Sequence, residues 1–288
     1  MDHNLVFGKI HIIEWLRKDD RRSGREVYEE ILAMTAAKRE VPVVYHRVSS
    51  RRSFLERLQR IEHDLHTTGK VPLLHIDSHG DDDGIGPTRD DGLSWPEFMR
   101  VLTPLNRATG VLLPVFLATC EGVWGIKMAR PADRAPFFAL MGPKRPVKPG
   151  EVVRGMRTFY RKVLIEKDGH SAISAMNAIV DQNEDVFRAF NCEQLFKMVW
   201  DDFLADAANA EWINARVEDA VAKERAKGRS GPHLESVRNY MRAYLTDQPA
   251  RFEESRRNFF MIDLFPANDA RFNLTLTPVE DGADRSNT

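Results

Sequence analysis

Two residues of this sequence carry side chains that could work together as a nucleophile and its base. His79 follows an apolar run from Val71 to Asp77, and Cys120 follows another from Val111 to Ala118. An imidazole beside a thiol can accept its proton and produce the thiolate, which is the nucleophilic form of cysteine. The pair therefore predicts nucleophilic catalysis, with Cys120 as the attacking group and His79 as the general base and later the general acid.

Glycines lie close behind both candidate residues. Gly80 comes directly after His79, and Gly122 comes two residues after Cys120. A residue without a side chain lets the backbone approach a bound peptide carbonyl closely. We expect the backbone N–H groups of Gly80 and Cys120 to donate hydrogen bonds to the oxyanion that forms during attack.

Short apolar runs and helical patterns alternate through the first half of the chain. Five runs have the character of buried strands, namely Ile10–Trp15, Val41–Val48, Val71–Ile76, Val111–Thr119 and Phe137–Met141. Three Ser-x-x-Glu pairs stand at the head of helical patterns, as capping boxes do, namely Ser23 with Glu26, Ser53 with Glu56, and Ser94 with Glu97. Because single helices connect these strands, we expect an α/β fold with a mostly parallel sheet flanked by helices. Ligands bind at the carboxyl ends of such strands, which is where His79 and Cys120 lie.

The second half of the chain has a helical pattern. Apolar residues recur at helical spacing from about Pro149 onward, and one predicted helix covers Val186 to Leu204. We divide the chain into an α/β domain at 1–180, a helical C-terminal region at 181–266 that packs on it, and a tail at 267–288. The tail is expected to be disordered from about residue 281, where the sequence becomes polar.

Composition excludes several classes of partner. The 288 residues include 42 Lys and Arg against 43 Asp and Glu, a net charge of −1, so we expect no nucleic-acid partner. The longest apolar stretch, Val111 to Ala118, falls far short of the roughly 18 residues of a membrane span. The first residues lack a secretory-signal pattern, and the two cysteines are far apart. We therefore expect a cytoplasmic protein with reduced thiols and no membrane partner.

The two candidate motifs together resemble those of a known superfamily. An apolar strand ending in Ser78-His79-Gly80, followed about 40 residues later by one ending in Ala118-Thr119-Cys120-Glu121-Gly122, is similar to the caspase-like cysteine peptidases. That superfamily includes caspases, metacaspases, gingipains and bacterial CHAT-domain proteases. The resemblance implies a caspase-like fold and a thiol protease that hydrolyses protein or peptide substrates through His79 and Cys120 without a cofactor. It also implies a single-chain bacterial type, which often acts in stress or defence.

The sequence departs from the caspases next to the nucleophile. Ala118-Thr119 precede Cys120 where caspases carry Gln-Ala, so a preference for a substrate Asp does not carry over. The acidic turn that follows His79 is either a solvated loop or a rim that favours a basic substrate side chain. Four residues next to the motifs are candidates for a substrate pocket: Asp81, Asp82, Glu121 and Trp124.

Two other functions fit parts of the same sequence. Alternate residues of a strand face one side, so His75, Asp77 and His79, with Asp81 from the turn, could bind the metal of a metal-dependent hydrolase. Alternatively, the chain could be a non-catalytic caspase-like scaffold, with the C-terminal helices as the surface for a regulatory partner. The presence of both His79 and Cys120 favours the interpretation as a peptidase over the interpretation as a non-catalytic scaffold.

Overall fold

The computed structural model describes residues 5–35, 41–120, 122–123, 126, 129–130 and 132–276. The chain divides into two compact units. The first consists of residues 1–130 with 134–195, and the second of residues 131–133 with 196–288. The first unit holds a sheet flanked by helices and the second is helical, so the predicted α/β class with a helical C-terminal part is confirmed.

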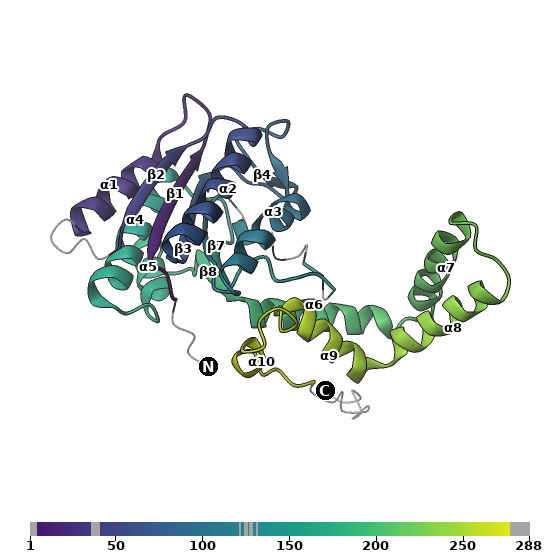
Figure 1. The fold of residues 1–288 in the computed structure, drawn as a ribbon. Coiled ribbons are helices and arrows are strands. Elements are labelled where there is room, and N and C mark those ends of the chain that lie inside the picture. Colours follow the sequence, from purple (N-terminus) through teal and green to yellow (C-terminus); the bar gives the residue numbers. More distant parts are fainter. Residues whose placement is uncertain are drawn as a thin grey trace, which may run out of the picture. The chain divides into compact units, whose positions relative to one another are not determined.

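The first unit is built on a six-stranded sheet (Figure 1). In spatial order its strands are β2 (Val43–Arg47), β1 (Lys9–Trp15), β3 (Pro72–Ser78), β6 (Pro114–Ala118), β7 (Ala139–Pro143) and β8 (Phe187–Asn191). All neighbouring strands are parallel except β7 and β8, which are antiparallel. A small hairpin of β4 (Gly84–Ile85) and β5 (Leu93–Ser94) follows β3. The sheet is thus mostly parallel, as predicted.

Helices cover both faces of this sheet (Figure 1). One face carries α1 (Ser23–Thr35), α4 (Pro149–Tyr160) and α5 (Ala172–Val180), with a π-helical turn at Arg161–Glu166 after α4. The other face carries α2 (Arg51–Thr68) and α3 (Trp95–Ala108). Alternation along β1 explains the division, because Ile10 and Ile12 join the core under α1 and α4, whereas Trp15 stacks on Phe54 of α2.

Only one of the three predicted capping boxes forms as expected. At the start of α3, the backbone N–H of Ser94 donates to the Glu97 carboxylate, as in a capping box. The box at α2 lies three residues earlier than predicted, because Ser50 is the N-cap and Ser53 is its partner. At α1, the Ser23 hydroxyl donates instead to Asp77 of β3.

The predicted helix from Val186 to Leu204 is wrong over its first residues. Phe187–Asn191 form β8, which pairs with β7, and α6 begins only at Cys192. The side-chain amide of Asn177 fixes this strand, since its Oδ1 accepts from the N–H of Phe187 and its Nδ2 donates to the same residue's carbonyl. The apolar spacing of Phe187 and Phe190 suits a helix, but long-range pairing with the sheet prevails. The sheet therefore extends beyond residue 180.

The second unit consists of helices around an aromatic cluster. Its helices are α6 (Cys192–Ala207, shared with the first unit), α7 (Ala210–Ala226), α8 (Pro232–Thr246), α9 (Gln248–Phe259) and α10 (Asn268–Arg271). Phe196 packs against Trp200, Phe252, Phe259 and Phe260. Across the described residues, none of the helices has the length and apolar character that crossing a membrane requires.

A pair of histidines, His11 buried and His46 half-buried, links β1 to β2 and gives the fold a pH dependence. His11 Nδ1 and His46 Nε2 lie 3.0 Å apart, and burial lowers the pKa of His11 to about 4. The unfolded chain binds this proton at an ordinary pKa of about 6.5, so the free energy of unfolding falls as the pH decreases from about 6.5 toward 4. We expect His11 to contribute about 2 kcal/mol to the loss of stability between pH 7 and pH 5.

Urea unfolding of wild type and His11→Gln at the two pH values measures this contribution. The variant should lose less stability than wild type on acidification, whatever its stability at pH 7. His63→Gln, at an exposed position of α2, is the matched control and should keep the wild-type dependence. An equal pH dependence in wild type and His11→Gln would contradict the prediction.

Candidate active site

The pairing of β3 with β6 sets His79 and Cys120 at equivalent positions. The two strands are parallel neighbours, and Asp77 is the partner of Ala118. His79 and Cys120 each lie two residues beyond that pair, at the same edge of the sheet. The backbones are in close contact there, since a Cβ added to Gly80 would lie 2.8 Å from the carbonyl oxygen of Cys120. The structure thus brings together the two strand ends that the sequence selects.

The strands that lead to both residues have alternate side chains facing α1 and α4. On β3, His75 contacts Tyr160 of α4 and Asp77 contacts Ser23 of α1. Phe116 of β6 stacks on His75, on the same face. His79 and Cys120 come just after the ends of these two strands, at Ser78 and Ala118. Cys120 is partly exposed, and 43% of the His79 side chain is exposed, so a substrate can reach both.

Asp20 is a site residue that sequence reasoning missed. Its Oδ2 lies 2.7 Å from Nε2 of His79 and also accepts the backbone N–H of Arg17 at 2.8 Å. Partial burial opposes ionisation of Asp20, but the hydrogen bonds from His79 and Arg17 outweigh it and lower the pKa of the carboxyl. The sequence feature that could have indicated Asp20 is its position after β1. Because β1 is parallel to its neighbour β3, the segments that follow the two strands start at the same edge of the sheet.

The Asp20 contact determines which nitrogen of His79 is left for chemistry. A carboxylate at Nε2 favours the tautomer in which Nε2 carries the proton, since the carboxylate accepts its hydrogen bond. Nδ1 is then the unprotonated nitrogen and can accept a proton from a thiol. A carboxylate at this place also orients the imidazole and stabilises the imidazolium that forms on proton transfer. The Asp20–His79 contact is the one that a Cys-His-Asp triad requires between its acid and its base.

The backbone hydrogen bonds around Gly80 bear on the predicted oxyanion donors, Gly80 and Cys120. Gly80 lies opposite Ile85 in a bridge whose hydrogen bonds run from Asp81 to Gly84 and from Gly86 to His79. Within the part of the chain that the structure describes, the amides of Gly80 and Cys120 donate to no backbone carbonyl. Among the described residues, neither N–H is thus engaged by a backbone carbonyl, and both stay candidates for donating to a substrate oxygen.

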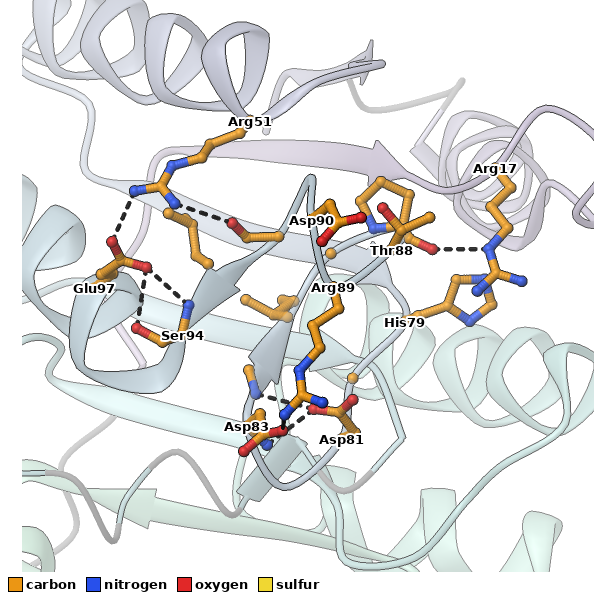
Figure 2. A pocket seen from close by; sticks show the side chains of 17 residues that line it. Arg17, Arg51, His79, Asp81, Asp83, Thr88, Arg89, Asp90, Ser94 and Glu97 are labelled. Atoms are coloured by element: carbon orange, nitrogen blue, oxygen red, sulfur yellow. Dashed lines mark hydrogen bonds and ion pairs between the residues drawn. The ribbon is translucent and has the colours of Figure 1, made fainter.

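A cavity of about 310 Å³ opens beside His79, formed mainly by the 79–94 loop and its hairpin. Figure 2 shows Arg17 and His79 at one end of the view and the Arg51–Glu97 ion pair at the other. Of the predicted pocket residues, Asp81 lines this cavity and Asp82 does not. Glu121 and Trp124 lie outside the described residues.

Most of the cavity's charges are already paired. Arg89 forms an ion pair with Asp83, and Asp81 Oδ1 accepts the N–H groups of Asp83 and Gly84. The acidic turn therefore stabilises its own loop through these contacts. Arg17 donates from Nε to the carbonyl of Pro87 at 2.8 Å and forms no ion pair with any described residue.

The structure does not bring the alternative metal ligands together. His75 is fully buried, its Nδ1 lies 3.2 Å from the Tyr160 hydroxyl, and burial lowers its pKa to about 3. Asp77 accepts from Ser23, and burial raises its pKa to about 7. Among residues 5–35, 41–120 and the other described segments, no three His, Cys, Asp or Glu side chains converge as metal ligands.

No model of a known protein family matches this chain, and a search of curated proteins finds no sequence with significant similarity.

Proposed function

We propose that this protein is a cysteine endopeptidase of caspase-like fold, possessing a nucleophile at Cys120, a general base at His79 and a third polar residue at Asp20. The main support is the register of β3 and β6, which brings the strand ends that precede His79 and Cys120 to one edge of the sheet. The 2.7 Å contact between Asp20 and Nε2 of His79 adds to it, because it leaves Nδ1 available as the base.

The residues suggest the following course of reaction. His79 Nδ1 takes the thiol proton, and the Cys120 thiolate attacks the carbonyl carbon of the scissile peptide bond. The amides of Gly80 and Cys120 stabilise the oxyanion, and His79 then gives its proton to the leaving amine. Water, deprotonated by His79, hydrolyses the resulting thioester and regenerates the thiol. No step requires a cofactor.

The pH dependence of Cys120 alkylation by iodoacetamide tests the proposal without a known substrate. A thiolate sustained by His79 should react with a midpoint well below the ordinary thiol pKa of about 8.5. His79→Ala should move the midpoint back toward 8.5. Both proteins carry Cys192→Ala, which removes the second thiol without burying a hydroxyl, since Cys192 is fully buried.

The same measurement can contradict the proposal. Slow alkylation with an identical midpoint in wild type and His79→Ala would mean that no activated pair exists in the resting protein. That result would favour the non-catalytic scaffold. Elemental analysis of the purified protein distinguishes the metal-dependent hydrolase, for which stoichiometric manganese or zinc is expected.

A further inference from the structure

Two buried carboxylates lie directly beneath the start of α1. Asp77 of β3 is 3% exposed and accepts the Ser23 hydroxyl at 2.8 Å. Glu14 of β1 is 1% exposed and accepts the N–H of Arg25 at 3.1 Å and the Tyr45 hydroxyl at 2.8 Å. Buried carboxylates are costly unless they are hydrogen-bonded, so these contacts hold the first turn of α1 to the sheet.

Gly24 shows how closely the helix approaches the two acids. A Cβ added to Gly24 would lie 3.0 Å from Asp77 Oδ2 and 3.3 Å from Glu14 Oε2. Carboxylates at a helix N-terminus satisfy free N–H groups and interact favourably with the helix dipole. The start of α1 is therefore fixed to β3 through Asp77.

The position of this anchor matters because its two residues are close in sequence to His79 and Asp20 of the proposed site. Asp77 is on β3, two residues before His79. Ser23, which donates to Asp77, comes three residues after Asp20. The loop that carries Asp20 is also held at its other end, where the Ser78 hydroxyl donates to the Trp15 carbonyl at 2.8 Å. Movement at the Asp77–Ser23 contact would thus displace Asp20 relative to His79.

We propose that Asp77 is a positioning residue, which acts through Ser23 and the start of α1 to hold Asp20 against His79. The inference rests on the proposed function, since it assigns Asp77 a role in aligning the same His79 and Cys120. Asp77 is buried under the start of α1, so it does not contact a substrate. Its effect is transmitted through the loop from Leu16 to Arg22.

The test uses the alkylation midpoint of Cys120 in the full chain, in the Cys192→Ala background. Asp20→Asn should raise the midpoint toward 8.5, and Asp77→Asn should raise it in the same direction. In the double variant Asp20→Asn/Asp77→Asn, the midpoint should be no higher than in Asp20→Asn alone, because both changes remove one interaction. Glu29→Gln is the matched control: Glu29 is also an acid of α1, but its ion pair is with Arg25 of the same helix and not with the loop that carries Asp20, so the midpoint should not move.

The measurement separates positioning from simple loss of stability. All variants are compared at a temperature where circular dichroism shows them folded, and a general loosening would not produce non-additivity with Asp20→Asn. If Asp77→Asn does not fold, Ser23→Ala removes the other side of the contact and should shift the midpoint in the same direction.

Results that contradict the positioning role of Asp77 differ from results that contradict the proposed function. A wild-type midpoint in Asp77→Asn and Ser23→Ala, with a raised midpoint in Asp20→Asn, would overturn the positioning role and leave the proposed function standing. Shifts that add in the double variant would also overturn it. A wild-type midpoint in His79→Ala would instead contradict the proposed function itself.

Discussion

Replacing Cys120 with alanine is expected to lower peptide hydrolysis by about 10⁴-fold or more, because the variant has no nucleophile to form the thioester. His79→Ala should cause a comparable loss, since members of a catalytic unit do not contribute additively. The measurement is the cleavage of a peptide library with diverse residues at every position, followed by mass spectrometry. Such a library also reports which side chains the cavity beside His79 accepts.

The second cysteine of the chain supplies the control for this prediction. Cys192 is fully buried at the start of α6, and its amide donates to the Phe138 carbonyl at 2.8 Å. Cys192→Ala should therefore lose some stability but keep its activity. Full activity of Cys120→Ala against peptides that wild type cleaves would contradict the assignment of the nucleophile.

The sheet edge at which His79 and Cys120 lie could be predicted, because it depends only on both residues following parallel strands. Each residue follows a continuous apolar run, and such runs form the buried strands of a parallel sheet. The sequence does not specify the register, but the observed pairing of Asp77 with Ala118 places the two residues at matching positions. Adjacent strand ends in this fold meet at one edge, so a pair found there is expected to be close.

Asp20 could not be predicted in the same way because its position depends on a loop. It stands in the polar segment Lys18-Asp19-Asp20-Arg21-Arg22, where neither spacing nor apolar pattern distinguishes one acid from the other. The capping-box interpretation of Ser23, three residues further on, is wrong for the same reason. Ser23 has the spacing of a capping box with Glu26, yet its hydroxyl bonds Asp77, which is 54 residues away. Long-range contacts of this kind leave no local pattern.

A methyl group at Gly80 is expected to lower peptide hydrolysis by about 100-fold while the fold persists, because small displacements of reacting groups are costly. The added Cβ of Gly80→Ala would lie 2.8 Å from the carbonyl oxygen of Cys120 and 3.1 Å from the Thr119 side chain. A backbone oxygen cannot rotate away, so one of the two strand ends must move. The shift would separate His79 from Cys120 and misdirect the Gly80 amide.

Gly169→Ala is the matched control for this substitution, since no atom lies within 4 Å of a Cβ added there. Both variants are compared by kcat and by melting temperature, and only Gly80→Ala should lose kcat. An increase in KM alone would place the effect on substrate binding instead of on the reacting groups. Wild-type kcat in Gly80→Ala would mean that the site tolerates movement of the strand ends, and that the Gly80 amide does not stabilise the transition state.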